Sequence, residues 1–150
     1  GSIYGRFGFS DVLTLFAALD CYVELYHGGN VPIRDFIHMD YDNDILVAVH
    51  IKKTPLKVTY LSQRNTATDF PVLAVAVSEY EDKLHVSIGA RPVKADVLTV
   101  DLSEKTDMDQ LVKKVTESFS FGSNRRAGAD YRRHLSGVLF KRACTANNDN

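Results

Sequence analysis

The order of apolar patterns along the chain constrains its fold most strongly. Val72–Tyr80 and Leu84–Gly89 are rich in residues that favour strands, and the three polar residues between them predict an antiparallel hairpin. From residue 106 onwards, apolar residues recur at helical spacing instead. Strands followed by helices predict an α+β fold.

Shorter patterns before the hairpin predict one helix and several strands. Ser10 and Asp11 stand directly before an apolar run that starts at Val12, which is typical of an N-cap ahead of a short helix. Ile45–Ile51 is apolar enough to be a buried strand. The other segments expected to be extended are Cys21–Leu25, Val31–Phe36 and Lys57–Leu61.

Two helices are predicted in the last third of the chain. Thr106 is the expected cap of the first, and its apolar face comprises Met108, Leu111, Val112, Val115 and Phe119. The second has an apolar stripe that leaves its arginines on the opposite face. This stripe consists of Tyr131, Leu135, Val138, Leu139 and Arg142. The polar tail 145–150 is expected to fray.

The chain has the composition of a globular protein. Of its 150 residues, 45% are hydrophobic and 25% are charged, which argues against disorder. The sequence has no apolar run long enough to span a bilayer and no secretory signal pattern, so a cytoplasmic location is expected. Cys21 and Cys144 lack paired spacing and are expected to be reduced, partly buried thiols.

Positive charge is concentrated in the last predicted helix. Six basic residues and one acidic residue lie between Arg125 and Arg142, although the formal net charge of the chain is −1. Three interpretations remain open: contact with nucleic acid, docking on the acidic remainder of the chain, or a solvated face. Nucleic-acid binding is not favoured, because no aromatic platform or groove-reading motif accompanies the charge.

Common catalytic and metal-binding motifs are missing from the sequence. It contains no Gly-Lys-Ser/Thr phosphate loop, no dinucleotide-binding glycine fingerprint and no nucleophile elbow. Its five histidines share no metal-ligand spacing. Asp40, Asp42 and Asp44 resemble the start of a calcium loop, but the later glycine and glutamate are missing, so a solvated turn is expected. No catalytic residue or metal ligand is assigned.

Several short phrases occur in an order that points to one protein family. They are Gly1–Ile3, Ser10–Val12, Ala18–Leu25, Val31–Phe36, Asp44–Val49, Asp69–Val77, Ile88–Ala95 and Tyr131–Arg133. In this order they resemble the FAD-binding subunit of the molybdenum hydroxylases, the family of xanthine dehydrogenase and carbon monoxide dehydrogenase. Two positions depart from that pattern: Ser2 stands where the family has asparagine, and Arg6-Phe7-Gly8 where it has Ala-Ser-Pro. The family's N-terminal subdomain, whose glycine-rich loop binds the pyrophosphate, has no counterpart in this sequence.

The resemblance implies a domain organisation and a set of cofactors. Residues 1–53 would end an FAD-binding subdomain, and residues 54–150 would form an antiparallel sheet packed against helices, like the C-terminal domain of the CO dehydrogenase flavoprotein. FAD would bind the complete subunit. Molybdopterin would lie on a large partner subunit and 2Fe-2S clusters on a small iron–sulfur partner subunit. Electrons would cross those clusters to FAD, which would pass them to NAD or another acceptor.

The resemblance also implies cofactor-binding positions. Asp11 would accept a hydrogen bond from the cofactor, and helix capping together with Ser10 is an equal alternative. Packing against a flavin or adenine ring is implied for two strand residues, for which a plain core strand is the alternative. The implied positions are Gly1, Ser2, Asp11, Ile45 and Leu46.

Two arginine-containing phrases are expected to have structural roles. Arg91-Pro92 is expected to fix the turn that leaves the hairpin. Tyr131-Arg132-Arg133 is expected to pack within the helical layer and pair with carboxylates. A non-catalytic interaction or assembly domain that keeps this fold without flavin is the alternative function for the whole chain.

Overall fold

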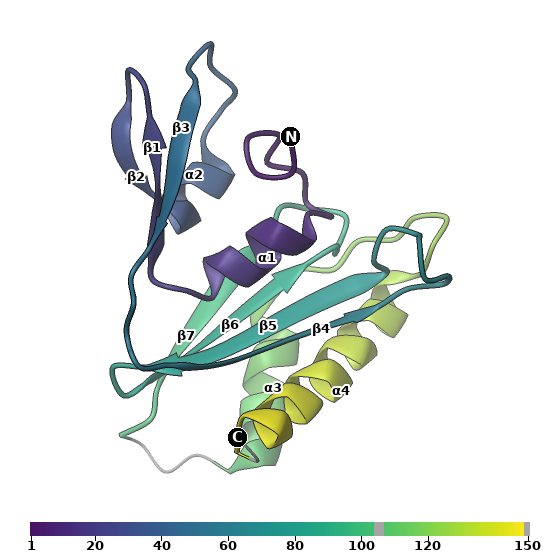
Figure 1. Ribbon diagram of the computed structural model, residues 1–150. Coiled ribbons are helices and arrows are strands. Elements are labelled where there is room, and N and C mark those ends of the chain that lie inside the picture. The colour runs from purple at the N-terminus through teal and green to yellow at the C-terminus, as the bar shows by residue number, and fades with distance from the viewer. Residues whose placement is uncertain (104–106, 149–150) are drawn as a thin grey trace.

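The computed structural model describes residues 1–103 and 107–148, which form two antiparallel sheets and four helices (Figure 1). The first sheet has the strand order β2–β1–β3 and the second β4–β5–β6–β7. The strands are β1 (Cys21–Leu25), β2 (Gly29–Pro32), β3 (Leu46–Ile51), β4 (Lys57–Gln63), β5 (Leu73–Tyr80), β6 (Lys83–Gly89) and β7 (Asp96–Asp101). The helices are α1 (Asp11–Ala17), α2 (Ile33–His38), α3 (Met108–Ser118) and α4 (Ala129–Asn148). This architecture confirms the predicted α+β class.

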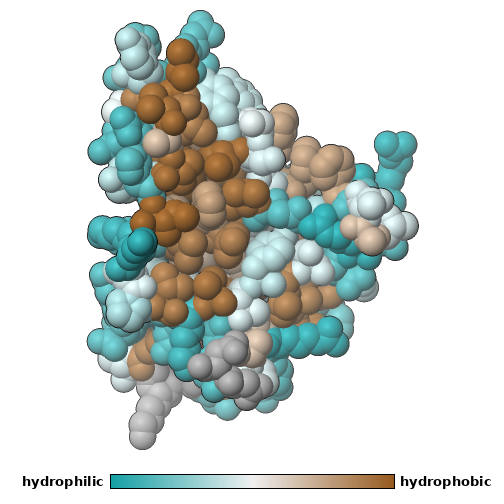
Figure 2. Space-filling model, viewed as in Figure 1, coloured by the Kyte–Doolittle hydropathy of each residue, from teal (hydrophilic) through white to brown (hydrophobic). Residues whose placement is uncertain are grey.

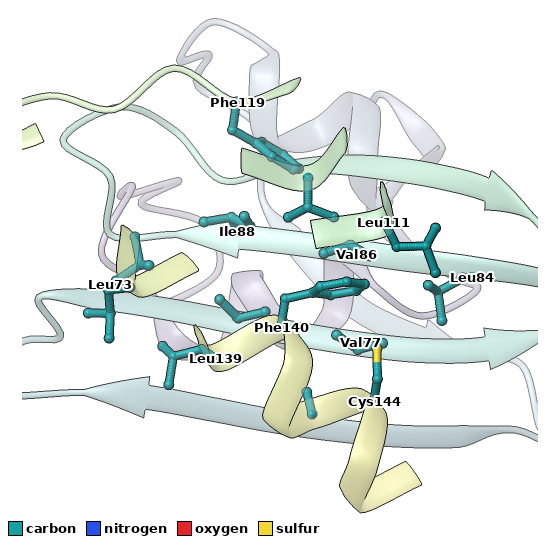
Figure 3. Packing of buried hydrophobic residues seen from close by; sticks show 14 of the residues in the cluster. Leu73, Val77, Leu84, Val86, Ile88, Leu111, Phe119, Leu139, Phe140 and Cys144 are labelled. Carbon is teal, nitrogen blue, oxygen red and sulfur yellow. The ribbon is translucent and has the colours of Figure 1, made fainter. Parts of the chain in front are cut away.

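The four-stranded sheet is covered on both faces (Figure 1). On one face, Leu73 and Val77 of β5 join a buried cluster with Phe140 of α4 (Figure 3). The alternate positions Ala74 and Ala76 point to the other face, where their small side chains let α1 approach closely. Strand β5 is therefore buried on both sides.

Helix α1 packs on the four-stranded sheet although it precedes the first sheet in the sequence. A Cβ atom at Gly89 of β6 would overlap with the Oγ1 atom of Thr14, so only glycine allows this approach. The Ser78 hydroxyl of β5 donates to the carbonyl of Ala18 at the end of α1. The two sheets are distinct, with residues 52–56 between them. A domain boundary after Lys53 stays a prediction.

The hairpin of β5 and β6 is confirmed with a shorter loop than predicted. Tyr80 pairs with Lys83, so the loop consists of Glu81 and Asp82. Both loop residues have positive φ angles, of 52° and 57°, as a tight primed hairpin turn requires. Strand β7 was not predicted. It forms the edge of the sheet and is only partly buried, so its apolar pattern is weak.

Two predictions for the first sheet are wrong. The segment Val31–Phe36 is extended only to Pro32, and α2 follows because Ile33, Phe36 and Ile37 recur at helical spacing and are all buried. Strand β3 is not buried. It lies at the edge of its sheet, and Val47 is 53% exposed.

Helix α4 departs from its predicted arrangement at both ends. Tyr131 is 51% exposed and Arg132 is fully buried, so the buried stripe is displaced at its start. Leu135 and Leu139 are buried as predicted. The helix continues through Asn148 instead of fraying, because Asn147 is buried, accepts a hydrogen bond from Thr59 and donates one to the Val77 carbonyl. Residues 149–150 of the predicted tail lie outside the described part of the chain.

Arg132 does not pair with a carboxylate, in contrast to the prediction. Its guanidinium donates to the carbonyls of Val72, Gly122 and Ala127 and to the side-chain oxygen of Asn124, at 2.7 to 2.9 Å. Four neutral acceptors thus satisfy a buried cation. The arginine ties α4 to β5 and to the turn that precedes the helix.

Helix α3 has the apolar face that was predicted, with Leu111 and Val115 buried. Its N-cap is Asp107, whose carboxylate accepts from the amide of Asp109 at 3.3 Å. The predicted cap, Thr106, lies outside the described residues. Within residues 1–103 and 107–148, no helix is long and apolar enough to cross a membrane.

Candidate functional site

The N-terminal segment before α1 is held in place by a buried arginine. Arg6 is 1% exposed, and its guanidinium carbon lies 4.2 Å from the ring centroid of Phe36 in α2. The rings of Tyr4 and Tyr41 lie at 5.1 and 5.3 Å. The Nη1 group donates to the carbonyl of Asp40 at 2.8 Å. The sequence marked this position as a departure from the family but did not indicate an aromatic cage.

The N-terminal segment and the start of α1 enclose a hollow of about 440 Å³, here called the Asp11 hollow. Its lining comprises Gly1, Ser2, Phe7, Phe9, Ser10, Asp11, Val12 and Phe70. Three of the five implied cofactor positions are therefore adjacent. The other two, Ile45 and Leu46, do not line it.

Three phenylalanine rings form an exposed aromatic wall beside Asp11. Phe7 and Phe9 stack with their centroids 5.2 Å apart and their planes 5° apart. Phe70, from the connection between β4 and β5, lies 4.4 Å from Phe9. Each ring is between 41% and 51% exposed. Sequence reasoning missed this wall, because only the closely spaced Phe7 and Phe9 give a local signal and Phe70 is distant in the chain.

Asp11 is tied to the four-stranded sheet. Its Oδ1 atom accepts from the hydroxyl of Tyr60 and from Arg64, the latter at 2.7 Å. Burial, followed by the hydrogen bond to Asp11, raises the pKa of Tyr60, and the same carboxylate raises the pKa of Arg64. The helix-capping bond comes from Ser10, whose Oγ accepts from the amide of Leu13 at 3.2 Å.

Ile45 and Leu46 lie at the start of β3. Ile45 is 63% exposed, and its carbonyl accepts from the amide of Tyr26 at 2.9 Å. Leu46 packs against the buried cluster of the first sheet. Ile45 and Leu46 do not line the Asp11 hollow. The five implied cofactor positions therefore form two separate groups, one at this hollow and one at the start of β3.

The acidic turn before β3 is more ordered than a solvated turn. The Asp44 carboxylate accepts from the amides of His27 and Gly28 at 2.9 and 2.7 Å, and from its neighbour Ile45 at 2.7 Å. The amide of His27 is the main cause that lowers the pKa of Asp44. Asp44 therefore fixes the β1–β2 turn, a role that the sequence pattern did not indicate.

A second hollow, of about 320 Å³, shares Phe9 and Phe70 with the first and is here called the Lys94 hollow. Its remaining lining comprises Gly8, Pro71, Ala90, Pro92, Val93, Lys94, Asn124 and Arg126. Arg126 pairs with Asp69 at 2.9 Å and lies over the Phe70 ring at 5.4 Å. The hydrogen bond from Arg126 is the main reason why the pKa of Asp69 is lowered.

The loop that forms one wall of the Lys94 hollow is braced from behind. The buried Arg91 donates to the carbonyls of Ser120 and Lys94, at 2.8 and 3.0 Å. This confirms that Arg91 fixes the turn that leaves the hairpin. The amide of Ala90 donates to the carbonyl of Gly8 at 2.6 Å, and a Cβ at Gly8 would overlap with the Val93 carbonyl.

The remaining polar groups form no metal site within the described ranges, where no cluster of three or more histidine, cysteine or acidic side chains could hold an ion. Cys21 and Cys144 are free and buried, as expected. Burial raises the pKa of Cys21 to about 12 and that of Cys144 to about 11, so both thiols are protonated at neutral pH.

No protein-family model matches the chain. No curated protein matches it either. Several solved structures match the chain. A chain of carbon monoxide dehydrogenase from Oligotropha carboxidovorans shares 19% identity and a TM-score of 0.80, over 97% of this chain and 58% of that one. A chain of quinoline 2-oxidoreductase from Pseudomonas putida 86 shares 17% identity and a TM-score of 0.80, over 99% of this chain and 60% of that one.

A chain of carbon monoxide dehydrogenase from Hydrogenophaga pseudoflava gives the same TM-score of 0.80 at 16% identity, over 98% of this chain and 59% of that one. The present chain thus spans about three fifths of the length of these solved chains. At such low identity the similarity concerns the fold. The chain therefore has the fold of chains found in carbon monoxide dehydrogenase and quinoline 2-oxidoreductase, as the order of its sequence phrases predicted.

Proposed function

We propose that this chain is part of the FAD-binding component of a molybdenum hydroxylase, an oxidoreductase of the xanthine dehydrogenase type. The observation that carries the proposal is the fold, which matches a carbon monoxide dehydrogenase chain over 97% of this chain with a TM-score of 0.80. The order of the family-like phrases, read from sequence alone, supports the same assignment. Fold by itself does not fix function, so the residues at the site must also suit the cofactor.

The residues of the Asp11 hollow fit one part of a flavin dinucleotide. Phe7 and Phe9 offer half-exposed rings to a planar ring system. Both partners that the described residues provide for Asp11 use Oδ1, which leaves Oδ2 as an acceptor for a hydroxyl or ring N–H group. Gly1 has open space where a side chain would be. In this proposal Asp11, Ser2 and Gly1 hold the cofactor, and Arg64 keeps the carboxylate in position.

The same hollow offers little to the pyrophosphate of FAD. Among the residues that the structure describes, no lysine or arginine lines it. Phosphates are usually held by cations or by backbone N–H groups of glycine-rich loops and helix ends. We therefore propose that groups outside this chain hold the phosphates, and that this chain alone binds FAD weakly or not at all.

When bound, FAD supplies the redox chemistry, and the protein supplies binding and orientation. We propose that a molybdopterin-binding large subunit and a 2Fe-2S small subunit deliver the electrons, and that NAD or another acceptor receives them. Ile45 and Leu46 remain proposed cofactor contacts. Because they lie apart from the Asp11 hollow, they would meet a different portion of the cofactor.

Purification of the tagged protein from its natural host tests this function. Molybdenum, iron and flavin should co-purify with the chain and give the visible spectrum of an iron–sulfur flavoprotein. A pure chain with none of the three would contradict the proposal.

One observation favours the alternative of a non-catalytic assembly domain. Asp11 is bound to Tyr60 and Arg64, and Arg6 lies in its aromatic cage, so side chains of this chain itself hold the N-terminal segment in place. The same purification separates the two functions. Molybdenum and iron that co-purify without flavin would favour the assembly domain.

A further inference from the structure

The Lys94 hollow has the features of a second small-ligand site, although it shares Phe9 with the proposed FAD site. Its volume of about 320 Å³ is near the lower end of the range for ligand pockets. Gly1, Ser2 and Asp11 do not line it. Its two aromatic walls, Phe9 and Phe70, are 41% and 51% exposed, so both rings can contact a ligand.

The polar groups of this hollow are suited to an anion. Two cations, Lys94 and Arg126, line it together with Asn124, and no carboxylate from ranges 1–103 and 107–148 does. Lys94 donates only to the carbonyl of Met39, at 3.3 Å, among the partners that the described residues provide. Arg126 uses Nε and Nη2 for Asp69, so its Nη1 group can donate to a ligand.

Asn124 adds a neutral donor to the two cations. The amides of Arg126 and Ala127 and the guanidinium of Arg132 all donate to its Oδ1 atom. With Oδ1 used in this way, the Nδ2 group is the part of Asn124 that can donate to a ligand. Charged and neutral donors therefore line the same hollow.

The apolar part of the hollow is suited to a planar ring. The planes of Phe9 and Phe70 are tilted by 49° at a centroid distance of 4.4 Å, and Phe7 supports Phe9 from the other side. Ala90, Pro92, Val93 and Lys94 also line the hollow, and Arg91 braces their loop through the carbonyls of Ser120 and Lys94. A site whose walls are already fixed loses little conformational entropy when a ligand binds.

We propose that the Lys94 hollow binds a planar aromatic ligand with an anionic substituent. The ring lies against Phe9 and Phe70, and the anion is bound by Lys94, Arg126 and Asn124. Two sources have this chemistry: an aromatic carboxylate, or the base and phosphate of a nucleoside monophosphate.

Titration with 2-naphthoate and with its neutral amide tests the proposal. The chain has no tryptophan, so the fluorescence of the naphthalene ring can be followed without interference from protein indole groups. The acid should bind about tenfold more tightly than the amide, the effect of a hydrogen bond to a charged group. Equal affinities, or no binding of the acid, would overturn the proposal.

Charge variants of the chain locate the site. Lys94→Gln should weaken naphthoate binding, whereas Arg125→Gln should not, because Arg125 does not line the hollow. Asp69→Asn should strengthen binding, because it releases Arg126 from its carboxylate partner and keeps the Oδ1 acceptor for the Phe70 amide. If these residues had only a structural role, Asp69→Asn would not bind naphthoate more tightly than the wild type. Unchanged or weaker binding by Asp69→Asn would therefore contradict the site.

Competition experiments identify the source of the ligand. Displacement of naphthoate by adenosine 5′-monophosphate, but not by adenosine, would show that the hollow takes a nucleotide. Naphthoate binding that the nucleotide does not displace would show that it takes an aromatic carboxylate. Both results support the site. Failure of these tests leaves the FAD proposal intact, because that proposal depends on Asp11 and not on Lys94.

Discussion

In the four-stranded sheet, β5 is covered on both faces, whereas in the three-stranded sheet Val47 and Ile51 of the edge strand β3, and Ile45 just before it, are exposed. Figure 2 shows hydrophobic surface along the part of the molecule where Figure 1 draws β3. The larger sheet therefore has a self-contained apolar core. The smaller one also has a buried apolar cluster, and polar side chains such as the buried Arg6 and the turn-forming Asp44 add to it.

The two regions meet at a cluster of polar side chains. Arg34 of α2 donates to the carbonyl of Ala17 at 2.9 Å and to the hydroxyl of Tyr80 at 3.1 Å. Its guanidinium also lies 3.1 Å from Nδ1 of His85, which stacks on Tyr80. We infer that apolar burial sets the stability of the larger region, and that polar contacts set how the smaller region is attached to it.

The largest effect is expected in the core of the four-stranded sheet. Phe140 is fully buried, so Phe140→Ala should lower the free energy of unfolding by about 3–5 kcal/mol. Tyr131→Ala on the same helix is the matched control, because that side chain is half exposed and should cost much less. Denaturant melts measure both variants. Equal losses would contradict the assignment of the buried face.

The polar cluster of Arg34, Tyr80 and His85 between the two regions should contribute less stability in acid. Burial lowers the pKa of His85 to about 4, whereas an ordinary histidine titrates near 6.5. The folded chain therefore holds the neutral imidazole. Its contribution to stability is complete above pH 6.5 and declines as the pH falls towards 4, by up to about 1.4 kcal/mol per unit.

Denaturant melts of the wild type and of His85→Gln between pH 7 and pH 4.5 isolate this contribution. The wild type should lose more stability than the variant over that interval, because carboxylates titrate in both proteins. If the free energy of unfolding depended on pH in the same way in both proteins, protonation of His85 would not destabilise the folded chain.

A smaller and local effect is expected at the N-terminal segment. Arg6→Ala removes the cation from its aromatic cage and should cost about 2 kcal/mol. Amide hydrogen exchange of residues 1–10 should speed up, and exchange in β5 should not. Arg125→Ala, at an exposed position, serves as the control. Faster exchange throughout the chain would show that the two regions do not open separately.

The periodic parts of the fold could be predicted from the sequence, and the non-periodic parts could not. Val72–Tyr80 and Leu84–Gly89 have long apolar patterns, and both are strands within one or two residues. Strand β7 is short and partly exposed, so its pattern gives little signal. The helical spacing puts Arg132 on the face opposite the apolar stripe, where a charged side chain is normally exposed. Its burial depends on the Val72 carbonyl, which is distant in the chain, and on three acceptors in the non-periodic segment just before α4.

The candidate site could be predicted only in part for the same reason. Gly1, Ser2 and Asp11 are close in sequence, and the fold brings them together at one hollow. Tyr60, Arg64 and Phe70 reach that region from β4 and the connection that follows it. No local spacing connects them with Asp11, so sequence reasoning found the carboxylate and missed its partners.

The most direct test of the proposed function is the flavin content of the assembly purified through this chain, compared between wild type and Asp11→Ala. Loss of one hydrogen bond to a charged group should lower FAD affinity about tenfold to a hundredfold. Arg64→Gln breaks the bond between Arg64 and Asp11 but keeps the carboxylate, so it controls for the structural role of the pair.

The proposed function predicts that Asp11→Ala loses flavin and turnover with the flavin-dependent acceptor. Molybdenum, iron and the reduction of an artificial acceptor upstream of the flavin should stay unchanged, and excess FAD should partly restore turnover. Arg64→Gln should retain more flavin than Asp11→Ala. Unchanged flavin content and unchanged turnover in Asp11→Ala would show that Asp11 does not bind the cofactor, and an assembly without flavin in the wild type would contradict the proposed function itself.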